Sequence, residues 1–60
     1  LKGKTPVKCN SIIKRGQYCV AIGNGIVKGY NKKDMTFDLT LDLVGIALED
    51  SKDNLVMVKI

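Results

Sequence analysis

The sequence predicts an all-β domain, either a small barrel or a sandwich-like antiparallel sheet of five to six short strands, with no substantial helix. Two observations lead to this prediction. Apolar residues alternate with polar ones in most segments, which is the period of a pleated strand. Residues that favour turns separate these segments at short intervals, and 60 residues then leave little room for anything but strands.

The first strand is expected at residues 5–9, where Val7 and Cys9 would share a face. Pro6 cannot donate a backbone hydrogen bond, so it fits the start or the edge of a strand. Residues 1–4, which are rich in Lys and Gly, are expected to form an arm before this strand. Residues 14–16 then predict a turn, because Gly16 can take a positive φ.

The second strand is expected at residues 17–22. Because both of its faces are fairly apolar, this strand should be central in the sheet. Asn24-Gly25 follows and predicts a two-residue hairpin turn, in which both central residues need positive φ. The strand would return through residues 26–30, with Ile22 pairing near Val27.

Residues 35–43 alternate large apolar side chains with Thr and Asp, which predicts a strand with one wet face or an extended segment along a neighbouring subunit. At Leu43-Val44 the apolar phase slips by one residue, so a bulge or bend is expected there, and Gly45 is consistent with it. Residues 43–49 and 55–60 then predict a C-terminal hairpin around the polar turn 50–54.

One domain is the most that 60 residues can form, and such a domain buries only about 60% of the surface of its unfolded chain. With no Trp, one Phe and two Tyr, few large side chains are available for a core. We therefore expect residues 1–60 to be a single small β domain, either a fragment or terminal module of a larger chain or a subunit of an oligomer. No apolar run reaches the length of a membrane span, so no membrane partner is expected.

The absence of histidine rules out zinc sites of the Cys2His2 type within this chain and leaves its hydroxyl groups without their usual general base. We therefore predict that the chain is not an enzyme and has no cofactor. Cys9 and Cys19 lie in apolar segments, where a free Cys behaves as a small hydrophobe. Two buried, reduced thiols are expected, with one disulfide as the alternative.

Acidic residues predict no metal site. Asp34, Asp38 and Asp42 are spaced by four, and on a strand such residues lie roughly 13 Å apart, which favours a solvent-facing surface over a cation site or docking stripe. The run 50–54 resembles a calcium loop only in part, because the distal Glu of an EF-hand is missing. A hairpin turn is the better interpretation.

Charge divides the chain into halves. Residues 1–33 carry eight cations and no acid, a balance of +8, whereas residues 34–60 carry six acids and two Lys, a balance of −4. The two halves are expected to face each other within the fold or across copies, and a nucleic-acid surface is the alternative. In that alternative Tyr18 or Tyr30 would stack on a base. Its phosphate-binding set would be Lys14, Arg15, Lys28, Lys32 and Lys33.

Five segments follow one another in an order that resembles a known family. They are Pro6-Val-Lys, Ile13-Lys-Arg-Gly-Gln-Tyr-Cys-Val, Gly23-Asn-Gly-Ile-Val, Val44-Gly-Ile-Ala-Leu-Glu-Asp and Leu55-Val-Met-Val-Lys-Ile60. This order is similar to the small C-terminal β domain of bacteriophage and other viral structural proteins, such as tail fibres, tailspikes, and head fibre or decoration proteins. The glycines at positions 16, 25 and 45 match the turns and the penultimate strand of that domain.

The resemblance implies a non-enzymatic virion component, made in the host cytoplasm, that forms a homo-oligomer, with a trimer favoured, and contacts other virion proteins. We expect the oligomer to form through the β-sheet, with apolar strand faces buried against each other or against symmetry mates. A small basic nucleic-acid-binding β-barrel is the first alternative, and an appended domain of a larger enzyme is the second. The side chains predicted at the oligomer interface are Phe37, Leu39, Leu41, Val56, Val58 and Ile60. The residues predicted to shape turns and bends are Gly16, Asn24, Gly25 and Gly45.

Overall fold

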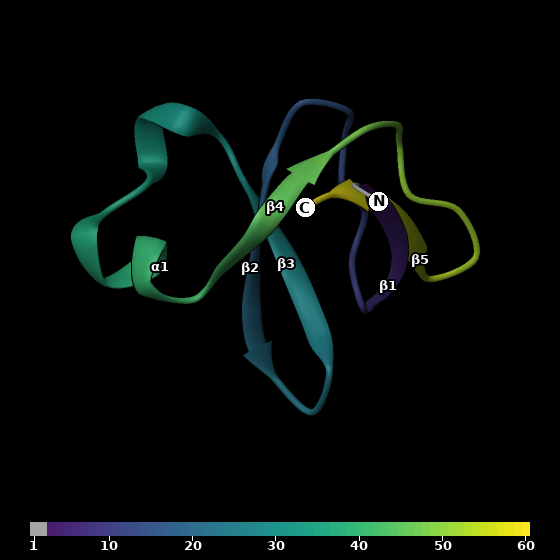
Figure 1. Ribbon diagram of the computed structural model, residues 1–60, viewed down its shortest axis with the longest axis horizontal. Helices are drawn as coiled ribbons and strands as arrows, with labels where there is room; N and C mark the ends of the chain where they lie inside the picture. Colours follow the sequence, from purple (N-terminus) through teal and green to yellow (C-terminus); the bar gives the residue numbers. More distant parts are fainter. Residues whose placement is uncertain (1–2) are drawn as a thin grey trace.

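Five strands close into a barrel in a computed structural model that describes residues 3–60 (Figure 1). The elements in chain order are β1 (Lys4–Cys9), β2 (Tyr18–Gly23), β3 (Ile26–Tyr30), the 3-10 turn η1 (Lys32–Asp34), α1 (Phe37–Leu41), β4 (Leu43–Ala47) and β5 (Leu55–Lys59). The prediction of a small all-β barrel without a substantial helix is confirmed. Of the arm expected at residues 1–4, the first two residues lie outside the described part, and Lys4 already belongs to β1.

The spatial order of the strands is β1-β3-β2-β4-β5, and β5 returns to β1. Four of the pairings are antiparallel. The fifth, between β1 and β3, is short and parallel, and it closes the barrel at Lys8↔Ile26 and Cys9↔Val27. Because β2 pairs with both β3 and β4, the prediction that residues 17–22 form a central strand is confirmed.

The β2–β3 hairpin turns at Asn24-Gly25, as predicted. The φ angles of these residues are 56° and 73°, which meets the requirement of a type I′ turn. The expected register is wrong by one residue, because Val27 pairs with Ala21 and leaves Ile22 as a bulge. The pairs farther from the turn are displaced by the same one residue, so that Val20 pairs with Lys28.

The C-terminal hairpin of β4 and β5 is confirmed, and so is the bulge at the start of β4. On β2 the pairing advances by one residue, from Cys19 to Val20, while on β4 it advances by two, from Gly45 to Leu43. Val44 is therefore the extra residue. The bulge reverses which side of β4 faces inward from that point on.

Two of the predicted structural glycines act through different causes. Gly16 has a φ of 89°, in the left-handed region that side chains with a Cβ rarely adopt. Gly45 instead allows a close approach of strands, since a Cβ there would overlap the backbone oxygen of Lys59 and the side chain of Val58. One glycine permits a turn, and the other permits β4 to lie directly against β5.

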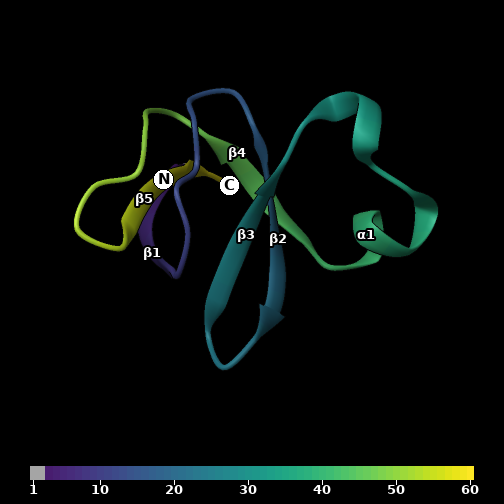
Figure 2. The ribbon, with the colours of Figure 1, turned by 180° about the vertical axis from the view of Figure 1, so that it is seen from behind.

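The prediction of a strand at residues 35–43 is wrong. Both β3 and β4 are antiparallel to β2 and lie on either side of it, so they run in the same direction. The chain must cross over β2 to join them, and such a crossover needs about a dozen residues, usually with a helix. The 31–42 connection supplies this crossover through η1 and α1, and in both views it projects from the side of the barrel away from β1 and β5 (Figure 1, Figure 2).

The barrel interior receives side chains from all five strands and from one loop. Ile13, in the loop between β1 and β2, is fully buried. It fits because β3 carries Gly29 opposite, where a Cβ would lie 3.0 Å from the Ile13 Cγ2 atom. The residues of this core are Cys9, Ile13, Cys19, Val27, Ala47, Val56 and Val58.

Hydrogen bonds beside the barrel join two connections, residues 10–17 and residues 48–54. The Ile13 backbone N–H donates to the Ser51 hydroxyl at 2.9 Å, and the Ser51 N–H donates to the Ile13 carbonyl at 2.8 Å. The turn predicted in residues 50–54 is centred on Asp53 and Asn54, whose φ angles are 54° and 63°. The second connection therefore fixes the buried loop residue in place.

Candidate interaction surfaces

Two exposed large apolar side chains of the crossover lie on one face of α1. Phe37 is 77% exposed and Leu41 is 69% exposed, and their spacing of four residues places them side by side on the helix. Thr36 caps the N-terminus of the helix, and its hydroxyl accepts a hydrogen bond from the Leu39 N–H at 3.2 Å. Local capping thus presents two large apolar side chains to solvent.

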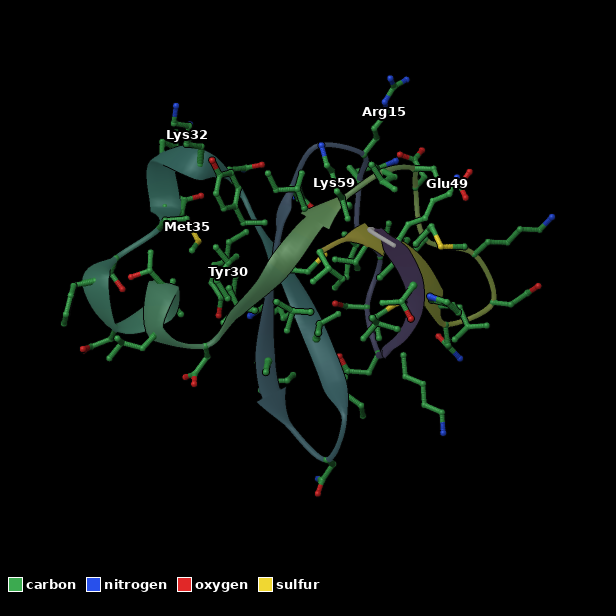
Figure 3. The ribbon with its side chains drawn as sticks, in the orientation of Figure 1. Arg15, Tyr30, Lys32, Met35, Glu49 and Lys59 are labelled. Atoms are coloured by element: carbon green, nitrogen blue, oxygen red, sulfur yellow. The ribbon has the colours of Figure 1, made fainter. Side chains whose placement is uncertain are left out.

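The opposite side of the crossover faces the barrel. Val20 is only 1% exposed, yet it points away from the barrel core, since its neighbour Cys19 belongs to that core. Met35 lies on the inner side of the crossover, toward the barrel (Figure 3). Leu39, predicted at an interface, is half-buried on α1. Residues 31–42 therefore have one face turned inward and one outward.

The predicted interface residues on β5 lie in two different places. Val56 and Val58 are 1% and 0% exposed and belong to the barrel core of this chain. Ile60 is 68% exposed, and its N–H donates to the Gly3 carbonyl at 3.0 Å. The structure thus leaves Phe37, Leu41 and Ile60 on the surface and does not bring all six predicted side chains together.

A hollow lies beside the two described ends of the chain, at the outer surface of β1 and β5. It has a volume of about 540 Å³. Lys4 on β1 and Lys59 on β5 stand directly opposite each other in the antiparallel pair. We call it the Lys4–Lys59 hollow, and it is lined by Gly3, Lys4, Leu48, Lys59 and Ile60.

Sequence reasoning missed this hollow because Lys4 and Lys59 are far apart in the chain and neither belongs to a recognisable motif. The signal that would have found it is the register between the first and last strands. The bulge at Val44 also matters, since it turns Ala47 inward while Leu48 stays on the surface. The register between β1 and β5 therefore brings Lys4 and Lys59 together in the hollow.

The cationic residues of the predicted phosphate-binding set lie in two groups, one at the β2–β3 hairpin and its exit and one at the turn before β2. Lys28 on β3 places its Nζ atom 5.4 Å from the centre of the Tyr30 ring. Tyr18 pairs with Tyr30 across the hairpin, and Lys32 and Lys33 follow in η1. These residues adjoin one another along the β2–β3 hairpin and its exit.

The remaining two, Lys14 and Arg15, occupy the turn before β2. The Gln17 side chain accepts from the Lys14 N–H at 2.9 Å and donates to the Asn31 side chain at 3.1 Å, which links this turn to the start of the crossover. The Arg15 N–H donates to the Asp50 carboxylate at 2.8 Å, so an acid lies beside that part of the basic set. Figure 3 shows Arg15 and Lys32 along the same edge of the molecule.

The acidic stripe expected on a strand is divided by the crossover. Asp34 ends η1, Asp38 lies in the first turn of α1, and Asp42 caps its C-terminus. Within residues 3–60 no group of three or more His, Cys, Asp or Glu side chains is placed to hold a metal ion. Asp38 and Asp42 instead run along α1 next to its apolar face, since they too are four residues apart.

The two cysteines are free thiols buried in the barrel core, as expected. Burial raises the pKa of the Cys19 thiol above its ordinary value, and the neighbouring Cys9 adds to the rise. A thiolate is the reactive form of cysteine. The position of Cys19 therefore favours a packing role over a nucleophilic one.

Comparison of the chain with protein-family models, with curated proteins and with solved structures finds no match. Of the helices in residues 3–60, none has the length and apolar character that crossing a membrane requires.

Proposed function

We propose that this chain is a non-enzymatic assembly module that associates with copies of itself. The observation that carries the proposal is the exposed pair Phe37 and Leu41 on a helix that projects from the barrel (Figure 1). Adjacent large apolar side chains in water are typical of a contact surface. Burying one of them stabilises a complex by about 1.5–3 kcal/mol, before the cost of association.

The closed sheet narrows the way in which copies associate. Each strand already has two neighbours, so an added strand can pair only where these contacts are short, as between β1 and β3. We therefore propose association through side chains of the outer surface, in place of the association through the β-sheet that the sequence predicted. Val56 and Val58 are not part of this contact, because the chain buries them itself.

The virus particle is the setting we propose for this assembly. The support is the order of the sequence segments, from the turn at Gly16 through the hairpin at Gly25 to the last two strands. In virion proteins with such domains, small β modules contribute by packing against copies of themselves and against other virion proteins. A trimer is the oligomer we favour, assembled from chains made in the host cytoplasm.

The experiment is native mass spectrometry and sedimentation of the chain and of two matched variants. Phe37→Ser removes the exposed ring from α1 and should shift the chain to monomer. Ile12→Ser is the control, since Ile12 is also 77% exposed but lies in the loop before β2. A wild-type chain that stays monomeric at high micromolar concentration would overturn the proposal, as would equal effects of the two substitutions.

A second candidate function, nucleic-acid binding, is favoured by one specific observation. The cation of Lys28 lies over Tyr30, and Tyr18 is the cross-strand neighbour of that ring. Cations beside aromatic rings are the parts from which single-strand-binding surfaces are built. Lys32 and Lys33 extend the surface toward the crossover.

Salt dependence of binding to single-stranded DNA or RNA tests this candidate. The logarithm of the binding constant should fall linearly with the logarithm of the salt concentration. Lys32→Ala should reduce the magnitude of that slope by about one. Lys52→Ala changes an exposed residue outside the proposed nucleic-acid-binding surface and should leave the slope unchanged. No binding at low salt would remove the candidate.

A further inference from the structure

Two cations stand opposite each other in the Lys4–Lys59 hollow. Lys4 and Lys59 are direct partners in the β1–β5 pair, and like charges in that position destabilise a sheet. Leu48 and Ile60 line the same hollow with apolar surface. Cations beside an apolar floor fit an occupant that is both acidic and apolar.

The exposed face of α1 has that complementary character. Phe37 and Leu41 supply the apolar part, and Asp38 and Asp42 form the acidic row next to it. We call these four residues the α1 knob. Each chain therefore carries an acidic, apolar projection and a basic, apolar hollow.

The knob and the hollow lie on different parts of the chain's surface. In Figure 1 and Figure 2, α1 stands at one side of the molecule, whereas β1 and β5, which carry Lys4 and Lys59, stand at the other. A chain that bears two complementary patches at separate places forms a head-to-tail contact with a copy of itself. Such contacts close into rings or continue into filaments.

We propose that the α1 knob of one copy docks into the Lys4–Lys59 hollow of a second copy. The inference rests on the proposed self-association and specifies its geometry. Phe37 and Leu41 then pack on Leu48 and Ile60 of the second copy, while the acidic row faces its lysines. The occupant is a second copy because the two patches match in charge and in apolar character.

Two single substitutions test the knob and the hollow independently. Asp38→Lys reverses a charge of the knob and leaves the hollow intact, and Lys59→Glu reverses a charge of the hollow and leaves the knob intact. Each should weaken self-association at least about tenfold in sedimentation, which is about 1.4 kcal/mol. Matched controls are Asp34→Lys in η1 and Lys52→Glu in the 50–54 turn, which make the same charge changes at exposed positions outside both patches and should leave association unchanged.

An equimolar mixture of the two variants gives the decisive result. The Lys59→Glu copy supplies an intact knob and the Asp38→Lys copy an intact hollow, and the two reversed charges attract each other at the next contact. Native mass spectrometry should therefore show mixed assemblies that contain both variants and that neither variant forms alone. Circular dichroism and urea unfolding confirm that each variant is folded.

Two other results overturn the inference and differ in what they leave standing. If Lys59→Glu self-associates like the wild type while Phe37→Ser does not, helices pair with each other, and the knob-to-hollow contact is wrong although the assembly role survives. If the wild-type chain itself is monomeric at every concentration, the assembly role fails together with the contact.

Discussion

The barrel and the 31–42 crossover carry similar sequence patterns and adopt different structures. In the barrel, alternation of apolar and polar residues gives strands, because each strand finds two partners. In residues 35–43 the same alternation gives a capped helical turn, because the strands it joins are already paired with β2. Alternation therefore predicts a strand only where the topology offers a neighbour.

The barrel and the crossover differ in where their apolar side chains lie. The barrel buries its own apolar residues around Ile13 and Val58, both fully buried. The crossover turns only part of its apolar surface inward and leaves Phe37 and Leu41 in water. We expect substitutions in the barrel to change folding stability and substitutions on the outer face of the crossover to change association.

The largest effect should come from Gly45→Ala, which tests whether the barrel depends on the contact of β4 with β5. The added Cβ would overlap the backbone oxygen of Lys59, and backbone atoms have little room to move aside. We expect a loss of more than about 4 kcal/mol or complete unfolding, measured by urea denaturation.

Gly25→Ala is the control for that substitution. It has open space around the added Cβ but a φ of 73°, so strain alone should cost about 1–2 kcal/mol. Similar losses for the two variants would show that β4 and β5 tolerate a wider spacing.

The next largest effect should come from the neighbouring residues Ile12 and Ile13. Ile13→Ala removes a fully buried side chain and should cost about 2–5 kcal/mol, because the barrel has few other residues with which to fill the cavity. Ile12→Ala changes a side chain that is 77% exposed and should stay within about 0.5 kcal/mol. Equal losses in thermal unfolding would mean that the loop does not hold Ile13 in the core.

Local patterns predicted much of the barrel, including the Asn24-Gly25 turn, the central strand and the slip at Val44. These features depend on neighbouring residues, whose steric preferences are the same in any fold. The crossover was not predicted, because its form depends on which strands pair with β2. The same limit applies to the hollow, since Lys4 and Lys59 meet only through the closure of β1 on β5.

A smaller effect is expected where the two regions meet, at Val20. Replacing residues 32–41 with a Gly/Ser linker of equal length should leave the barrel folded but expose the outer face of β2. In the wild type, Val20→Ala should cost about 2 kcal/mol, whereas in the linker variant it should cost almost nothing. A double-mutant cycle from urea denaturation measures the difference, and equal costs would mean that something other than the crossover covers Val20.

Within the crossover itself, Thr36→Ala should lower the stability of α1 against local unfolding by about 1 kcal/mol. The substitution removes the hydroxyl that accepts a hydrogen bond from the Leu39 N–H. Amide hydrogen exchange should speed up in residues 37–41 and remain unchanged in β1 and β5. Thr36→Ser keeps the hydroxyl and serves as the control. Faster exchange throughout the barrel would show that the helix and the sheet unfold as one unit.

The smallest effect concerns the ionisation of Cys19 in the barrel. Burial, with a further contribution from Cys9, raises the pKa of this thiol in the folded state above its ordinary value of 9.0. Above that pH the unfolded chain releases a proton that the folded chain retains, so stability is fully present below pH 9 and is lost as the pH rises further. Urea unfolding between neutral and alkaline pH should show a steeper decline for the wild type than for Cys19→Ala. Parallel curves would mean that the thiol ionises as readily in the barrel as in the open chain, and the packing role assigned to it would then be wrong.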